Sequence, residues 1–173
     1  LLRGINVSGH NMIKMDVLKS LLENAGFQNV RTYIQSGNVF VDSEEEHDAS
    51  VGFKIKQEIF KELGLEVPVV VITKEDLEAC FKNNSYLKEK ECDTKKLYVA
   101  FLSKELQGSA INDLKISQFK PDEAAIDKSR IYIKYAVGAG KTRLDQKYIE
   151  KKLNLVATIR NWNTVSTLLE MFE

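Results

Sequence analysis

Cysteine, histidine and proline are scarce in this chain, with two residues of each. Cys80 and Cys92 are too few and too far apart in the sequence to indicate a disulfide scaffold or a zinc knuckle. Two unmodified thiols of a protein kept in a reducing cytoplasm explain them better. His10 and His47 have no metal-ligating residues at a suitable spacing. We therefore expect no metal site, and no residue pattern indicates a cofactor.

Long hydrophobic runs are also missing. The longest apolar run, at 67–72, has the length of a strand rather than of a membrane span. No basic segment followed by an apolar core opens the chain, as a secretory signal would require. We therefore expect a cytoplasmic protein without a membrane partner. The chain starts at Leu1 instead of methionine, so we expect a short segment to precede the first predicted strand.

An excess of one charge is absent overall but present locally. Lysine plus arginine equals aspartate plus glutamate at 25 each, so no global field favours nucleic acid or a membrane surface. Between positions 128 and 160, however, nine basic residues stand against two acidic ones, a local excess of seven. This excess favours an anionic ligand in the last third of the chain.

The first 72 residues show the pattern of a small α+β unit. Apolar residues at helical spacing predict one helix at 14–25 and a second that ends at Gly64. Two β-rich runs around the turn at 35–38 predict a hairpin. The predicted order is βαββαβ, which is the ferredoxin-like arrangement. Its strands are predicted at 1–7, 30–34, 39–41 and 67–72.

The rest of the chain repeats this order after a charged and polar segment at 73–95, which we predict to be a helical linker. We therefore predict an α+β fold of two tandem ferredoxin-like (βαββαβ) subdomains, at 1–72 and 96–173, with an added C-terminal helix. The elements of the second subdomain are predicted as strands at 97–102, 123–126, 131–136 and 155–158 and helices at 105–114, 144–153 and 164–172.

This topology brings polar loops together in each half. In the first half, the exit of the first strand and the hairpin turn share one end of the sheet. In the second half, the loop at 138–143 and the end of the last strand share an end. The candidate ligand-binding residues are Arg3, Asn6, Gln35, Ser36 and Asn38 in the first half and Lys141, Thr142, Arg143, Thr158, Arg160, Asn161 and Asn163 in the second.

The loop at 138–142 reads Gly-Ala-Gly-Lys-Thr, but it is not a nucleotide-binding phosphate loop. The Walker pattern needs a glycine six residues before the lysine, and that position holds Tyr135. Glycines before a helix start, together with Lys141 and Arg143, favour an anion site. A flexible surface turn with two solvated cations explains the same residues equally well.

The segment at 158–165 holds the only tryptophan and several polar residues at a predicted helix start. Asn161 or Asn163 is expected to cap that helix, and Arg160 adds charge near its positive dipole end. Trp162 is expected to pack between the last helix and a sheet, with a stacking platform as the alternative.

The sequence contains few residue patterns that are typical of an active site. Ser36 lacks the strand–elbow–helix setting of a hydrolase nucleophile, and no pair of carboxylates is placed beside the polar loops. The aromatic signature of RNA-binding ferredoxin-like sheets is missing from the strands at 39–41 and 131–135. The residues do not decide whether the protein is an enzyme.

Three segments resemble a bacterial family known as domain of unknown function 1697. They are Leu-Arg-Gly-Ile-Asn-Val at 2–7, Arg-Thr-Tyr-Ile-Gln-Ser-Gly-Asn-Val at 31–39, and the segment at 157–165. The resemblance covers nearly the whole chain and implies two ferredoxin-like subdomains. It implies no established activity, cofactor or catalytic residue.

Three hypotheses follow. The first is a protein that binds a phosphate-bearing small molecule or a nucleic acid segment through the residues named above. The second is an enzyme that acts on such a ligand, and the third is a structural or partner-binding module in which the polar residues only cap helices and fix loops. The sequence assigns no oligomeric state.

Overall fold

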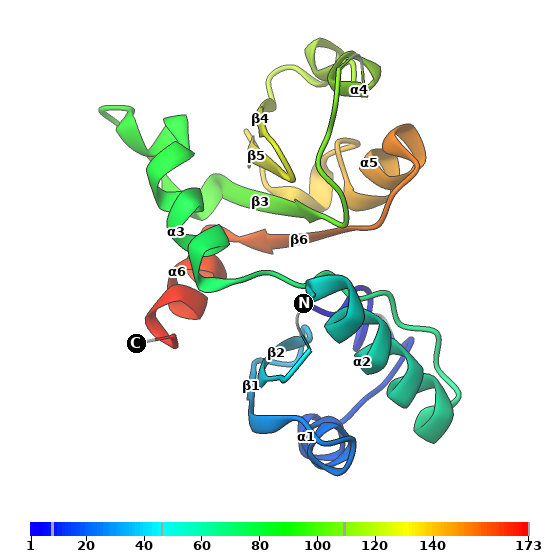
Figure 1. Ribbon diagram of the computed structural model, residues 1–173. Helices are drawn as coiled ribbons and strands as arrows, with labels where there is room; N and C mark the ends of the chain where they lie inside the picture. Colours follow the sequence, from blue (N-terminus) through cyan, green and yellow to red (C-terminus); the bar gives the residue numbers. More distant parts are fainter. Residues whose placement is uncertain (8, 46, 109, 173) are drawn as a thin grey trace. The chain divides into compact units, whose positions relative to one another are not determined.

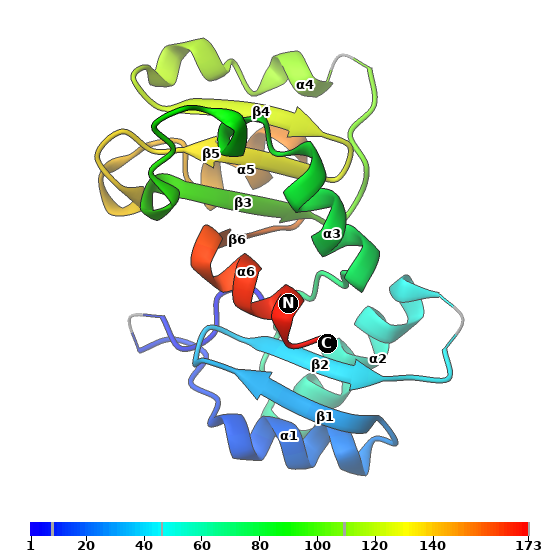
Figure 2. The ribbon, with the colours of Figure 1, turned by 90° about the vertical axis from the view of Figure 1, so that its left-hand side faces the viewer.

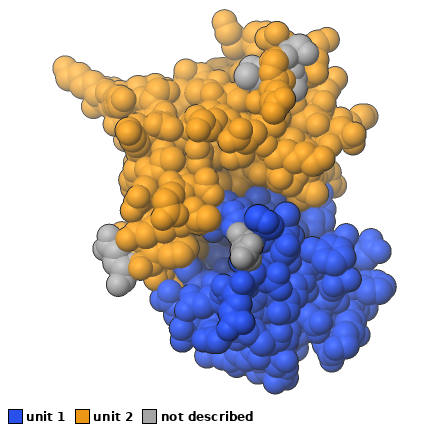
Figure 3. Space-filling model, in the orientation of Figure 1, with its two compact units in different colours: residues 1–72 blue, residues 73–173 orange. Residues whose placement is uncertain are grey.

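The protein has an α+β fold, seen in a computed structural model that describes residues 1–7, 9–45, 47–108 and 110–172. The chain divides into two compact units, residues 1–72 and 73–173, which Figure 3 shows in two colours. Each unit has its own sheet and its own apolar core. Within the described residues, no helix combines the length and the apolar character needed to cross a bilayer.

Unit 1 is built on an antiparallel hairpin of β1 (Gln28–Tyr33) and β2 (Asn38–Asp42), in which Tyr33 pairs with Asn38. Helices α1 (Met15–Asn24) and α2 (Asp48–Leu63) complete the unit (Figure 1). Their apolar faces meet the hairpin in a core that includes Leu22, Val30 and Ile59. Helix α2 ends at Gly64 in the left-handed conformation that glycine favours, as the sequence predicted.

The predicted strands at 1–7 and 67–72 are only partly formed. The N–H of Leu2 donates to Gly37 (2.7 Å), the N–H of Arg3 donates to Pro68 (2.9 Å), and the N–H of Val70 donates to Leu1 (2.9 Å). The first three residues therefore lie between the hairpin and the segment before Thr73. Pairing stops there because Gly4 and Asn6 have positive φ, which turns the chain away. The prediction of a strand as far as Val7 was thus too long.

Unit 2 contains an antiparallel four-stranded sheet in the order β4-β5-β3-β6. The order places β5 between β3 and β4. In Figure 2 the strands lie one above another in this order, with α3 in front of the sheet and α5 behind it. The elements of the unit are α3 (Lys74–Asn83), β3 (Leu97–Leu102), α4 (Ala110–Asp113), β4 (Glu123–Asp127), β5 (Arg130–Lys134), α5 (Gln146–Leu153), β6 (Ala157–Asn161), α6 (Trp162–Glu170) and the short 3-10 turns Ser85–Lys88, Thr94–Lys96, Ile116–Phe119 and Ala139–Lys141.

The two faces of this sheet are covered differently. Alternate residues such as Ala100, Ile131 and Ile133 pack with α5 in one core. The intervening residues face α3 and α6, where Arg130 is only 6% exposed and bonds to Asp76 of α3 (2.9 Å). This ion pair and the apolar side chains of α3 hold that helix against the sheet.

Two predictions about unit 2 need correction. The predicted helix at 105–114 is a four-residue helix, α4, because its sequence lacks a continuous apolar stripe; Ser109 lies outside the described residues. The final helix begins at Trp162, two residues earlier than predicted, because Asn161 caps it. Residues 73–95, predicted as a helical linker, contain α3 and the 3-10 turn Ser85–Lys88 and fall within the second compact unit; a linker role for them stays a prediction.

Candidate functional site

The loop that follows β5 is fixed by one carboxylate. Asp122 accepts a hydrogen bond from the N–H of Ala136 (2.8 Å) and another from the hydroxyl of Thr142. The Thr142 hydroxyl oxygen accepts the N–H of Leu144 (3.0 Å), and the buried Tyr135 donates its hydroxyl to the carbonyl of Leu144 (2.8 Å). Both ends of the loop are therefore tied to the sheet before α5 begins.

A cavity of about 190 Å³ opens beside this loop. We call it the loop hollow. One wall comes from the residues that lead into β4, and the other comes from the loop after β5. Its lining residues are Gln118, Phe119, Lys120, Pro121, Asp122, Val137, Gly138, Lys141, Thr142 and Arg143.

The loop hollow is cationic. Lys120, Lys141 and Arg143 stand against Asp122 alone, which leaves an excess of two positive charges among the lining residues. All three cations are exposed, and none forms an ion pair with a carboxylate of the described chain. Lys134, at the end of β5, contrasts with them because it contacts both Glu89 (2.7 Å) and Glu123 (3.1 Å).

Arg160 of β6 lies apart from this hollow. Its guanidinium donates to the hydroxyl of Thr158 (2.7 Å) and to the carbonyl of Ile159 (3.0 Å), and the side chain is 8% exposed. Burial lowers the pKa of Arg160 to about 10, so the group still carries its charge at neutral pH. Thr158 and Arg160 alternate with Ala157 and Ile159, which belong to the core on the α5 side. Both therefore face the opposite side of the sheet, toward α3 and α6.

The helix start beyond β6 is used for capping and packing. The Asn161 side chain accepts the N–H of Thr164 (2.8 Å), as predicted for one of the two asparagines. Trp162 is buried, and its ring lies 4.8 Å from that of Phe81 on α3. The tryptophan is thus a buried packing residue, as expected, although its ring contact is with α3 and not with a sheet, while Asn163 is exposed on the first turn.

Comparison with known proteins gives a family. A family model described as "Protein of unknown function (DUF1697)" matches residues 1–132, about three quarters of the chain. The chain belongs to this family. The resemblance predicted from the three sequence segments is therefore confirmed, although the loop hollow and β6 extend beyond the matched range.

One solved structure shares the fold of this DUF1697 protein. It is described as conserved bacterial protein SP0830 from Streptococcus pneumoniae, with a TM-score of 0.76 and 23% sequence identity. The alignment covers 100% of this chain and 96% of the other. No curated protein matches the chain.

In unit 1 of this family member, the end of the first segment and the hairpin turn lie next to each other, as predicted. The Asn6 side chain accepts the N–H of Ile13 (2.8 Å) and donates to the carbonyls of Ile13 and Gln35 (2.9 Å each). This amide ties the exit of the first segment to the hairpin turn. Asn6 adopts positive φ, a conformation that asparagine tolerates better than most residues.

Of the other unit 1 candidates, Asn38 and Ser36 also hold the turn. Asn38 is fully buried and donates to the carbonyl of Tyr33 (2.9 Å) and to the hydroxyl of Ser36 (3.1 Å). Arg3 is half-buried and Gln35 is exposed. A wall of ligand contacts formed by these residues stays a prediction.

In unit 2, the strand register places the ends of β5 and β6 at one end of the sheet, since Lys134 pairs with Leu97 and Asn161 pairs with Tyr98. The shared end was predicted correctly. The side chains nevertheless diverge: Lys141, Thr142 and Arg143 line the loop hollow beside β4, whereas Thr158 and Arg160 face α3 and α6.

Sequence reasoning missed Lys120 and Asp122. Both precede β4, about twenty positions before the loop that they help to shape. A lone Lys-Pro-Asp triplet indicates a turn and nothing more. Only the pairing of β4 with β5 shows that this triplet lies beside Thr142.

Proposed function

We propose that this DUF1697 protein binds a phosphate-bearing small molecule in the loop hollow, through Lys120, Lys141 and Arg143. The observation that supports the proposal is the convergence of three exposed cations, without carboxylate partners in the described chain, on one cavity. Cations held close together repel each other unless an anion lies between them. An anion that bridges two or three of them would relieve this repulsion.

Asp122 does not cancel this attraction. Its two oxygens already accept hydrogen bonds from Ala136 and Thr142, so the carboxylate is directed at the loop backbone and the threonine. Its role in the proposal is to hold the loop that carries Lys141 and Arg143. Arginine can bind two phosphate oxygens at once, and lysine supplies a compact charge.

The size of the cavity limits the ligand. Pockets that enclose a complete small molecule measure about 300–1,000 Å³, whereas the loop hollow measures about 190 Å³. The hollow therefore suits a phosphate group whose remaining substituent extends into solvent. With three cations and a balanced overall charge, a nucleic acid segment is the weaker partner, because its affinity depends on many phosphate contacts.

We also propose that the two units are tandem ferredoxin-like subdomains and that the protein is located in the cytoplasm. The sheet order of unit 2 and the backbone bonds of Leu1, Leu2 and Val70 in unit 1 support two tandem ferredoxin-like subdomains. The two free thiols, Cys80 and Cys92, support a reducing compartment.

Titration with inorganic phosphate and pyrophosphate, followed by amide NMR signals and calorimetry, tests the site. We expect the signals of Gly138, Lys141 and Arg143 to shift. Each of Lys141→Ala and Arg143→Ala should weaken binding about tenfold or more, because a hydrogen bond to a charged group contributes about 1.5–3 kcal/mol.

Lys151→Ala is the matched control, because Lys151 is an exposed lysine of α5 that does not line the hollow. It removes the same charge and should leave affinity within about twofold. Equal losses in the control and in the hollow variants would indicate a diffuse charge effect and contradict the site. Absence of any shift at millimolar phosphate or pyrophosphate would contradict the function.

A further inference from the structure

The two edge strands of the unit 2 sheet, β6 and β4, differ in whether their outward backbone groups form hydrogen bonds. Along β3, alternate residues bond to β5 and to β6: the N–H of Leu102 donates to Ser129 before β5, and the N–H of Ser103 donates to Val156 before β6. This alternation fixes which backbone groups of the edge strands point outward. On β6 the outward residues are Ala157, Ile159 and the last residue, Asn161, and on β4 they are Ala124 and Ile126.

The β6 edge is closed by side chains of α5. The outward N–H of Ala157 donates to the Glu150 carboxylate (3.1 Å), and that of Ile159 donates to the Gln146 side-chain oxygen (3.2 Å). The outward donors of Ala157 and Ile159, along the middle of this edge, are therefore occupied, and in the described chain only that of Asn161 remains where the chain turns into α6. Unpaired edge groups otherwise invite another strand, and proteins block them in such ways.

The β4 edge lacks such closure. Asp127 pairs with Arg130 across a two-residue turn, so Asp127, Ala125 and Glu123 bond to β5. The backbone N–H and C=O of Ala124 and Ile126 then point away from the sheet. Within the described residues, neither Ala124 nor Ile126 has a hydrogen bond on this outward side.

A groove of about 660 Å³ follows this edge. We call it the β4 groove, and its lining residues include Asn112, Lys115, Ile116, Gln118, Ala124 and Ile126. Its β4 wall thus consists of the same two residues whose backbone groups point outward. In Figure 2 the segment that contains α4 lies beyond β4. Asn112, Lys115 and Ile116 line the groove on that side.

We propose that the β4 groove binds an extended peptide segment of a partner protein, which pairs with β4 as an added strand. Ala124 and Ile126 each offer one N–H and one C=O, and main-chain bonds of this kind supply affinity in strand addition. Peptide residues opposite them would direct their side chains into the groove, next to Ile116 and Ile126.

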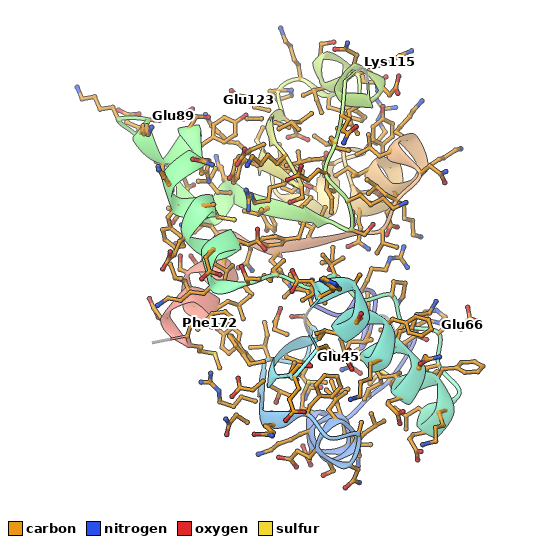
Figure 4. All side chains as sticks on the ribbon, in the orientation of Figure 1. Glu45, Glu66, Glu89, Lys115, Glu123 and Phe172 are labelled. Carbon is orange, nitrogen blue, oxygen red and sulfur yellow. The ribbon has the colours of Figure 1, made fainter. Side chains whose placement is uncertain are left out.

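The charge of the groove indicates which class of peptide it binds. Lys115, labelled in Figure 4, is exposed and lines the groove, and among the lining residues that the structure describes it is the one that carries a charge. A peptide with an acidic side chain between apolar ones, at alternating positions, therefore fits best. Glu123 and Asp127 point to the opposite face, where Lys134 and Arg130 contact them.

A second copy of the chain fits less well. Two β4 strands that pair in antiparallel fashion about Ala125 would place Glu123 of one copy opposite Asp127 of the other. Like charges directly opposite each other destabilise strand pairs. A dimer through β4 is therefore an alternative outcome of the test rather than the expected one.

The test uses the full chain and a fluorescein-labelled heptapeptide, Thr-Val-Thr-Glu-Thr-Val-Thr, with blocked ends. Amide hydrogen exchange by NMR should show fast exchange for Ala124 and Ile126 in the free protein and protection once the peptide is added. The amide of Ala125 already bonds to β5 and should be slow in both states. Fluorescence anisotropy gives the affinity.

Two variants make the test specific. Ala124→Pro removes an outward N–H without touching the ladder to β5, a place where edge strands tolerate proline. It should weaken peptide binding at least about tenfold, because a peptide carbonyl is left unpaired. Lys151→Ala alters an exposed lysine of α5 that does not line the groove, and this variant should bind the peptide as the wild type does. Unchanged anisotropy curves for Ala124→Pro, in a variant whose spectrum shows a folded sheet, would overturn strand addition.

Lys115→Glu tests the charge preference. It should weaken binding of the glutamate peptide and favour the same peptide with lysine in place of glutamate. No binding of the glutamate peptide to the wild type at millimolar concentration would overturn the proposal. A concentration-dependent dimer that Ala124→Pro abolishes would replace the peptide with a second copy.

Discussion

Substitution of Gly37 by alanine probes the packing of the first residues of unit 1 against the hairpin. Gly37 has φ +81°, and an added Cβ would lie 2.7 Å from the Cβ of Leu2 and 2.9 Å from the Cδ1 of Ile5. Both neighbours are 1% exposed, and the N–H of Leu2 donates to the Gly37 carbonyl (2.7 Å). A Cβ atom cannot swing aside as a side-chain end can, so the backbone of Leu2 or Gly37 must move.

Two separate losses of folding stability add when Gly37 is replaced by alanine. A left-handed conformation costs a non-glycine residue about 1–2 kcal/mol, and an extra methyl group in a packed core costs about 1–3 kcal/mol. We therefore expect Gly37→Ala to lower the free energy of unfolding by about 2–5 kcal/mol. Gly4→Ala separates the two costs: Gly4 has φ +70° but no heavy atom within 4 Å of an added Cβ, so only the backbone cost of about 1–2 kcal/mol applies.

Urea unfolding, followed by far-UV circular dichroism and by amide exchange at Val39 and Phe40, measures these values for unit 1. Trp162 lies in unit 2, and its fluorescence reports on that unit separately. If Gly37→Ala costs no more than Gly4→Ala, within about 0.5 kcal/mol, Leu2 does not lie against the hairpin as described.

Three further predictions concern unit 2. Burial raises the pKa of the Cys80 thiol to about 12. A thiol reagent at pH 8 should therefore modify only the half-buried Cys92 in the native protein and both thiols in urea. Rapid modification of both thiols in the native protein would contradict this prediction. Gly138 has φ +112° whereas Gly140 does not need positive φ, and an added Cβ meets no atom within 4 Å at either position. Gly138→Ala should therefore lower the free energy of unfolding, measured in urea, by about 1–3 kcal/mol, and Gly140→Ala should leave it nearly unchanged. Equal losses in the two variants would contradict backbone strain at Gly138. Burial raises the pKa of Tyr135 above the value of about 10 that tyrosine has in an unfolded chain, so from about pH 10 upward the unfolded state loses a proton that the folded state keeps. The free energy of unfolding should then fall as pH rises, with a smaller slope in Tyr135→Phe; identical slopes between pH 8 and 10.5 would contradict this.

Local features were predictable where neighbouring residues in the sequence decide them. The hairpin of β1 and β2, the end of α2 at Gly64 and the capping of α6 by Asn161 all depend on residues within one turn or one strand. The α+β class and the DUF1697 family also followed from the sequence. Periodicity and capping chemistry are short-range, so they leave a signal in consecutive residues.

The candidate site was predictable only in part. Lys141 and Arg143 could be identified because they follow two glycines in a basic segment. The prediction joined them to Arg160, since both segments lie at one end of the sheet. The alternation of side chains along β6 instead directs Arg160 to the face opposite α5, a distinction of one residue in register.

The sequence by itself determined the family, the end of α2 at Gly64, the cap of α6 and the local excess of positive charge, because these are properties of neighbouring residues. The tertiary structure alone decided that Lys120 lines the same hollow as Lys141 and Arg143 and that Asp122 holds Thr142. It also decided that the outward N–H groups of Ala157 and Ile159 on β6 are bonded to side chains while the β4 edge is open. The physical reason is that strand pairing brings together residues about twenty positions apart. Which backbone groups remain unpaired depends on the order of strands in the sheet, which no short stretch of sequence encodes.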